Sequence, residues 1–126
     1  MTILVTDRGF SPLPATPTAA LDLTPGDDLA ALAGRLQGLS LIRIAFPSAG
    51  DGRGFTLARR LRDMGYRGAL HATGAVIADQ YAMARRSGFD AVEIPKAMAH
   101  RQPEDQWLFR ADWQAHDPRH RLRAPA

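Results

Sequence analysis

A glycine-rich turn carries the residues best suited to hold a ligand. It reads Phe-Pro-Ser-Ala-Gly-Asp-Gly-Arg-Gly-Phe-Thr over residues 46–56, between an apolar run and a helix-like pattern. Glycines let the backbone approach a ligand closely, and the unpaired amides at a helix N-terminus attract anions. A guanidinium can add a two-point contact to such an anion. The sequence therefore predicts a small-oxyanion site at Gly52, Arg53 and Gly54.

Asp51, inside the same turn, works against this interpretation, because a carboxylate repels an anion. Three other roles stay open for it: capping the helix, pairing with Arg53, or binding a cation together with Glu93. The pattern is neither a Walker A motif nor a dinucleotide-binding fingerprint, since its glycines alternate with Asp and Arg. A tight structural turn, with Asp51 as the helix N-cap, is an equally good interpretation.

Further candidates stand where the next two expected strands end. His71 can act as a general acid or base, although a lone histidine there is more often a hydrogen-bonded structural residue. Glu93 alternates with apolar neighbours, so it faces the opposite side of its strand. Open α/β sheets bind ligands at the carboxyl ends of their strands. The candidate catalytic residues are therefore Asp51, His71 and Glu93, and Thr73 and Gly74 are expected to extend the anion site.

Other kinds of site are not favoured. Two carboxylates and a histidine could bind a metal ion, but their spacing specifies none, and we predict no metal site and no cofactor. No serine lies in a G-x-S-x-G turn, and no histidine pair has zinc-site spacing on an expected helix. The sequence contains no cysteine, which excludes disulfides, thiolate metal sites and a cysteine nucleophile.

The elements expected to position these residues alternate between strand and helix. Apolar runs predict strands over residues 1–6, 20–23, 40–46, 69–72 and 91–94. Helical spacing predicts helices over residues 27–38, 54–64, 76–87, 96–101 and 106–114, the last with a start signal at Pro103-Glu104-Asp105. Three prolines make residues 11–18 a loop. A glycine followed by an apolar residue ends three of the helices, as in left-handed helix caps, at Gly38, Gly65 and Gly88.

This order predicts an α/β fold of repeated βα units with a parallel sheet. Three strong units cannot close an eight-stranded barrel, so we expect a half-barrel-like or Rossmann-like open sheet. Open sheets leave edge strands, which makes a homodimer a reasonable expectation. We predict one domain over residues 1–115, with an N-terminal strand and proline-rich loop at 1–23 and a core at 24–95. A basic flexible tail is expected at 116–126.

Composition limits the classes of function further. The chain has 126 residues, with 16 basic and 13 acidic side chains and a net charge of +3. The basic residues alternate with Asp instead of forming a stripe interleaved with aromatic residues, which does not favour nucleic-acid binding. No apolar run approaches the roughly 18 residues of a membrane span, so we expect a cytoplasmic protein.

Both tryptophans, Trp107 and Trp113, fall in one short segment near the C-terminus. They either pack a helix onto the sheet or form an exposed aromatic face for a partner. The second interpretation makes them the candidate partner-binding residues.

The central sequence resembles a bacterial family known as domain of unknown function 934. The resemblance rests on Phe46-Pro47 and on four motifs: DGRGF at 51–55, LARRLR at 57–62, GYRGAL at 65–70 and RSGFD at 86–90. It covers about residues 39–93. Two positions depart from the family pattern: His71 stands where relatives usually have Arg, and Ala75 stands where they usually have Asp.

The family is usually labelled a probable oxidoreductase involved in sulfite reduction. Sulfite reduction needs several electrons delivered by a cofactor, and this chain has no thiol, no cluster ligands and no dinucleotide fingerprint. The resemblance therefore implies a non-redox accessory protein of assimilatory sulfite or sulfate reduction. It would bind a small oxyanion, sulfite reductase or another protein of the pathway. The alternatives are a small enzyme acting through Asp51, Arg53, His71 and Glu93, or a degenerate member with a structural or regulatory role.

Overall fold

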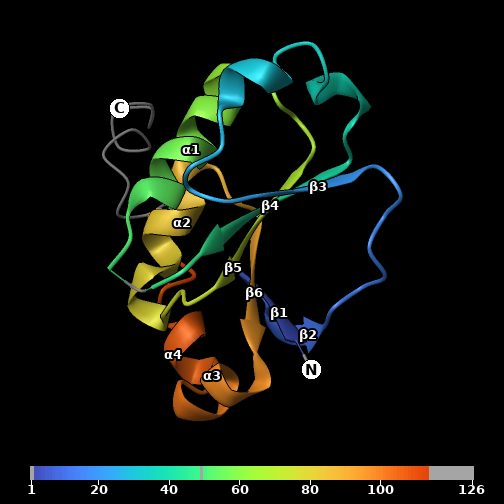
Figure 1. The fold of residues 1–126 in the computed structure, drawn as a ribbon. Helices are drawn as coiled ribbons and strands as arrows, with labels where there is room; N and C mark the ends of the chain where they lie inside the picture. Colours follow the sequence, from blue (N-terminus) through green and yellow to red (C-terminus); the bar gives the residue numbers. More distant parts are fainter. Residues whose placement is uncertain (1, 49, 114–126) are drawn as a thin grey trace, which may run out of the picture.

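A six-stranded sheet forms the centre of the computed structural model, which describes residues 2–48 and 50–113 (Figure 1). Its strands are β1 (Thr2–Thr6), β2 (Gly9–Pro12), β3 (Ala20–Leu23), β4 (Leu41–Phe46), β5 (Ala69–Gly74) and β6 (Ala91–Pro95). They lie in the order β2-β1-β6-β5-β4-β3. The four strands β3 to β6 are parallel, whereas β1 runs antiparallel to β6 and β2 antiparallel to β1. The α/β class is confirmed, but the sheet is mixed rather than wholly parallel.

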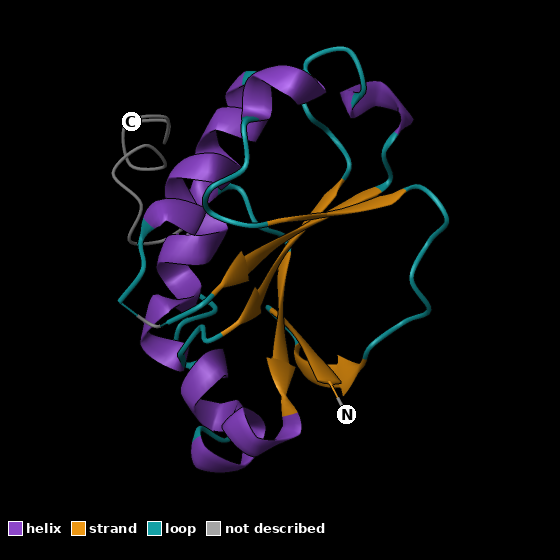
Figure 2. Cartoon of the chain, in the orientation of Figure 1, coloured by secondary structure: helices purple, strands orange, loops and turns teal. Residues whose placement is uncertain are grey.

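Helices cover one face of the sheet, and a loop from β2 to β3 crosses the other face (Figure 2). The main helices are α1 (Arg53–Asp63) and α2 (Tyr81–Ser87), with α3 (Lys96–Arg101) and α4 (Glu104–Leu108) following β6. Short 3-10 helices are η1 (Leu29–Leu32), η2 (Leu36–Gly38) and η3 (Ala78–Gln80). We call the sheet surface on the loop side the helix-free face; it carries the side chains of Arg43, His71 and Glu93.

Strand alternation explains the two faces. In β4, Ile42, Ile44 and Phe46 are buried against the helices, while the residues between them point the other way. Register carries the same pattern across β5 and β6, so the core combines strand and helix residues: Leu57, Ala58, Leu61, Leu70, Ala72, Tyr81, Ala84, Val92 and Ile94. Burying each large side chain of this kind contributes about 1.5–3 kcal/mol.

Several expected elements are confirmed. Strands form at 40–46, 69–72 and 91–94 and helices at 54–64 and 76–87, with bounds shifted by a few residues. Gly65 and Gly88 have φ of +98° and +117°. The next residues, Tyr66 and Phe89, are buried, and each amide bonds back to a carbonyl five residues earlier. These are the left-handed caps that the repeated glycine pattern predicts.

The predicted helix over 27–38 is wrong. The segment forms two separate 3-10 turns, and Gly38 does not adopt a left-handed conformation. A glycine in the middle of a helix, here Gly34, costs about 1 kcal/mol relative to alanine. Asp28 caps the first turn through the amide of Ala30 at 3.0 Å, while Asp27 turns back to the amide of Thr24 at 2.7 Å.

Two further boundaries differ from expectation. Residues 11 and 12, predicted as loop, belong to the edge strand β2, where a proline is tolerated because its missing N–H faces away from the sheet. The helix start predicted at Pro103-Glu104-Asp105 is confirmed by α4, but this helix ends already at Leu108. The edge strand predicted at 20–23 is confirmed as β3. The tail predicted at 116–126, and the domain end at 115, lie outside the described residues.

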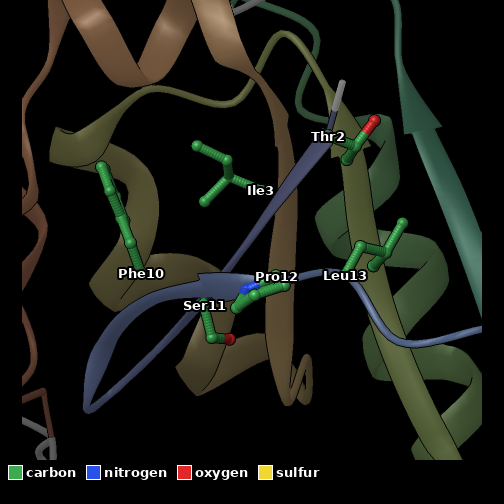
Figure 3. A pocket seen from close by; sticks show the side chains of 6 residues that line it. All are labelled: Thr2, Ile3, Phe10, Ser11, Pro12 and Leu13. Carbon is green, nitrogen blue, oxygen red and sulfur yellow. The ribbon is translucent and has the colours of Figure 1, made fainter.

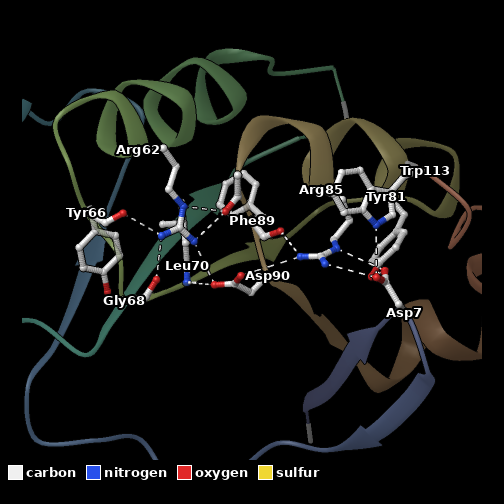
Figure 4. Close-up of polar contacts among 11 residues, drawn as sticks. Asp7, Arg62, Tyr66, Gly68, Leu70, Tyr81, Arg85, Phe89, Asp90 and Trp113 are labelled. Carbon is white, nitrogen blue, oxygen red and sulfur yellow. Dashed lines mark hydrogen bonds and ion pairs between the residues drawn. The ribbon is translucent and has the colours of Figure 1, made fainter. Parts of the chain in front are cut away.

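Arg62, at the end of α1, ties the two glycine caps together (Figure 4). Its guanidinium donates to the carbonyls of Tyr66, Gly68 and Gly88 and to the carboxylate of Asp90, at 2.8–3.0 Å. This clamp holds the amino ends of β5 and β6 against the helix layer. Within residues 2–48 and 50–113, every helix is too short or too polar to span a bilayer.

Candidate functional site

The glycine-rich turn is closed by its own side chains. Asp51 accepts hydrogen bonds from the guanidinium of Arg53 at 2.7 and 3.0 Å and from the Arg53 amide at 3.1 Å. Gly54 packs on Phe46, and a Cβ at that position would overlap the aromatic ring. Gly74 has φ of +97°, and a Cβ there would lie 2.8 Å from the Phe46 carbonyl oxygen. Packing therefore explains Gly54 of the turn, and backbone conformation explains Gly74 at the neighbouring end of β5.

This geometry bears directly on the predicted oxyanion site. The side-chain hydrogen bond from Arg53 lowers the pKa of Asp51 to about 2, so a negative charge stays beside the turn at neutral pH. Of the roles left open for Asp51, the structure shows pairing with Arg53. Anion binding at Gly52, Arg53 and Gly54 stays a prediction, and this pairing argues against it, because the ligand would have to displace a carboxylate already in place.

A different group of side chains converges on the helix-free face. Arg43 of β4 and His71 of β5 lie opposite each other in the parallel register, as do Thr73 of β5 and Glu93 of β6. Nε of Arg43 and Nδ1 of His71 each lie 2.7 Å from the same oxygen, Oε2 of Glu93. Two of the three candidate catalytic residues, His71 and Glu93, are thus in contact, while the third, Asp51, is occupied at the turn.

Glu93 is a buried carboxylate, with a side chain only 6% exposed. Burial alone would raise its pKa, but the hydrogen bonds from His71 and Arg43 outweigh burial and hold the pKa of Glu93 below its usual value. The carboxylate is therefore ionised at neutral pH. A buried charge of this kind is tolerated only with partners of good geometry, which Arg43 and His71 supply.

Beside this cluster lies a hollow of about 460 Å³. Its wall combines residues of four strands, of the loop between β2 and β3, and of the turn after β3: Leu13, Thr16, Asp22, Leu23, Thr24, Arg43, Ala45, Thr73 and Glu93. Thr16 accepts a hydrogen bond from Nη2 of Arg43 at 3.0 Å, which anchors the loop to the sheet. Nη1 of Arg43 lies 3.9 Å from Asp22, whose side chain is 81% exposed.

A second, mainly apolar hollow of about 250 Å³ lies under the same loop. Pro14 and Pro17 form its outer wall, and Ala69, His71 and Leu41 form its floor. His71 therefore touches an apolar space on one side and Glu93 on the other. The histidine–carboxylate contact fixes the orientation of the imidazole ring.

The two tryptophans do not form an exposed aromatic face. Trp107 is 1% exposed, and its indole N–H donates to the carbonyl of Gln102 at 2.9 Å. Trp113 is half-buried; its indole N–H donates to Asp7 at 3.2 Å, and the guanidinium of Arg85 stacks on its ring at 4.9 Å (Figure 4). Partner binding through them stays a prediction, and the packing favours the structural interpretation. A more exposed aromatic is Phe109, at 75%.

A larger apolar hollow of about 660 Å³ lies along the β1–β2 hairpin, lined by Thr2, Ile3, Phe10, Ser11, Pro12 and Leu13 (Figure 3). The adjacent edge of β2 is blocked for strand pairing. Glu104 of α4 accepts a hydrogen bond from the Phe10 amide at 2.7 Å, and Pro12 has no amide hydrogen. Such features protect an edge from joining a second sheet, so the expected homodimer gains no support from this edge.

Sequence reasoning missed Arg43, Asp22 and Thr16. Arg43 is the only charged residue in the apolar run over 41–46, which was the available signal that this side of the strand faces a polar surface. Among residues 2–48 and 50–113, no group of three or more His, Asp or Glu side chains is placed to hold a metal ion.

Comparison with known proteins gives one match. The profile of a family described as "Bacterial protein of unknown function (DUF934)" matches residues 20–120, well over half of the chain. No curated protein and no solved structure matches this chain.

Proposed function

Because the chain belongs to DUF934, a family of bacterial proteins of unknown function, we propose that it is a non-redox accessory protein of assimilatory sulfite reduction. The pathway comes from the resemblance, and a cytoplasmic location is part of the proposal. We further propose that the protein acts by binding on its helix-free face. The observation that supports this is the buried Glu93, held ionised by Arg43 and His71 beside a hollow of about 460 Å³.

Two features favour this face over the glycine-rich turn. Apolar residues in place of a buried ion pair often leave a protein equally stable or more stable, so packing alone does not account for Glu93 on this face. At the turn, by contrast, Asp51 and Arg53 satisfy each other. The helix-free face also has a loop over it, tied down by the Arg43–Thr16 hydrogen bond, which could exclude water from a bound ligand.

We propose the half-barrel-like form of the predicted fold rather than the Rossmann-like one. The parallel strands β3, β4, β5 and β6 neighbour one another in chain order, as barrel strands do. A Rossmann-like sheet instead reverses its strand order at a switch point. In a half-barrel, the helix-free face corresponds to the inside of the barrel, where binding side chains gather near the strand ends.

Growth of a deletion strain tests the function. We expect the strain to grow on cysteine and on sulfide, but not on sulfate or sulfite, and the wild-type chain to restore growth on both. The Glu93→Gln variant should fail to restore it, and the Arg59→Gln variant, which changes an exposed residue of α1, should succeed. Growth of the deletion strain on all four sources would refute the role in the pathway. Restoration by Glu93→Gln would refute the site.

A small enzyme is the second candidate, and the His71–Glu93 contact favours it. When Nδ1 of His71 carries the proton and donates it in a hydrogen bond to the carboxylate, Nε2 of the imidazole is left as a base. General-base catalysis uses this arrangement. The original set of four residues does not act together, because Asp51 and Arg53 pair at the turn. A His71→Gln variant separates the two candidates: it should keep ligand binding and growth if the protein only binds, and lose growth while keeping ligand binding if His71 transfers a proton.

A further inference from the structure

The hollow on the helix-free face has an unusual balance of charge. Three ionisable side chains reach its wall: the guanidinium of Arg43 and the carboxylates of Asp22 and Glu93. With both carboxylates ionised, the wall carries two negative charges and one positive charge. A multiply charged oxyanion entering this space would meet more repulsion than attraction, whereas a ligand with a protonated amine would be attracted.

Glu93 contributes an unused acceptor. Both hydrogen bonds that it accepts fall on Oε2, and among the described residues none is found to Oε1. The side chain is only 6% exposed, and it lines the hollow. Oε1 is not among the buried side-chain atoms that lack a partner, so we take it to be open to the hollow that Glu93 lines, where the N–H of a ligand would supply a donor.

Arg43 contributes unused donors close by. Its Nε and Nη2 donate to Glu93 and Thr16, but Nη1 is 3.9 Å from Asp22, beyond hydrogen-bond distance. Nη1 can therefore donate to an acidic group of a ligand. An unused acceptor and an unused donor, belonging to one ion pair, thus border the same small space.

We propose that this hollow binds a small zwitterion, in which a protonated amine and an acid group are one or two carbon atoms apart, such as a free α-amino acid or an aminosulfonate. The amine donates to Oε1 of Glu93 and faces Asp22, and the acid group accepts from Nη1 of Arg43. Thr73 offers a hydroxyl in the same wall. This ligand class rests on the binding site proposed above, but it does not depend on the pathway.

Calorimetric titration tests the ligand class. The probes are glycine, L-alanine, L-serine and taurine, each zwitterionic, with N-acetyl-L-alanine, L-alaninamide, sodium sulfate and sodium sulfite as controls. We expect at least one zwitterion to bind at least tenfold more tightly than every control. Equal or tighter binding of sulfate, sulfite or N-acetyl-L-alanine would overturn the proposal, and so would the absence of binding by all four zwitterions at millimolar concentration.

Variants locate the binding. Glu93→Gln should weaken zwitterion binding at least tenfold, and Asp22→Asn, at an exposed position that tolerates substitution, should weaken it about threefold to tenfold. The matched controls Asp63→Asn and Arg59→Gln, both exposed on α1, should leave it unchanged. If Glu93→Gln does not fold, as judged by circular dichroism, Asp22→Asn decides alone, and unchanged affinity in that variant would overturn the proposal.

The outcomes separate the ligand class from the proposed function. Failure of every zwitterion to bind, together with failure of Glu93→Gln to restore growth, would refute the ligand class and leave the site's function standing. Zwitterion binding that is lost in Glu93→Gln, together with full growth of that variant on sulfite, would support the ligand class and refute the part of this site in sulfite reduction.

Discussion

Replacing Arg43 with methionine tests the central ion pair of the helix-free face. The change keeps a long side chain on β4 but removes the cation that lies 2.7 Å from Oε2 of Glu93. The side chains of Arg43 and Glu93 are 15% and 6% exposed, so Glu93 would lose its main counter-charge without gaining water. We expect a loss of about 3 kcal/mol, the low end for breaking a buried pair, because His71 still donates to Glu93.

The effect depends on pH with a definite sign. In the wild type, the folded-state pKa of Glu93 lies below its ordinary value of 4.5, so its contribution to stability is present above pH 4.5 and is lost as the pH falls through the folded-state pKa. Without Arg43, only His71 is left to offset burial, so we expect the pKa of Glu93 to rise above its ordinary value. The variant should then lose stability as the pH rises, and its deficit should be larger at pH 8 than at pH 5 by an amount of the order of 1 kcal/mol.

Urea unfolding followed by circular dichroism measures both effects. A loss of about 3 kcal/mol lowers the midpoint by about 1.5 M for a slope of about 2 kcal/mol/M. The double variant Arg43→Met/Glu93→Leu should recover at least about 1.5 kcal/mol, since both charges are then gone. A single-variant loss below about 1 kcal/mol, or a deficit larger at pH 5 than at pH 8, would refute the reasoning on which the ionised, buried Glu93 rests.

Three other substitutions test the scaffold. Arg62→Lys keeps the charge but cannot make the five hydrogen bonds of the guanidinium, so thermal unfolding should show a loss of about 1.5–3 kcal/mol; an unchanged midpoint would contradict the clamp. Gly54→Ala should cost about 1–3 kcal/mol in urea unfolding, because its Cβ overlaps the Phe46 ring, and wild-type stability would show that the glycine is not required for packing. Glu104→Ala exposes the Phe10 amide at the sheet edge and should increase self-association with concentration in size-exclusion chromatography; a monomer at every concentration would show that the edge needs no such protection.

Local patterns predicted much of the scaffold. The run over 41–46 is apolar enough to define a buried strand, and Gly65 and Gly88 each precede an aromatic residue that folds back on the helix, so both caps were predictable. The failed helix over 27–38 has leucines at helical spacing, but the same spacing fits two 3-10 turns on either side of Gly34. Periodicity alone does not separate these two structures.

The candidate site was predictable only in part. His71 and Glu93 could be identified as strand residues of the right chemistry, but Arg43 pairs with a glutamate fifty positions away in sequence, and only the sheet register brings them together. At the turn the opposite holds, because Asp51 and Arg53 are two residues apart and their pairing was among the roles that the sequence left open. At the turn, Asp51 and Arg53 pair with each other, so the guanidinium that a ligand would have used is already occupied.

The most direct test of the central claim is to locate the binding surface by amide chemical-shift changes in the ¹⁵N-labelled protein during titration with L-serine, and separately with sodium sulfate. We expect L-serine to shift the amides of Asp22, Arg43, Thr73 and Glu93 and those of the non-proline loop residues among 13–18, and to leave the amides of residues 50–54 unchanged. Shifts confined to residues 50–54, with either probe, and none on the helix-free face, would contradict it.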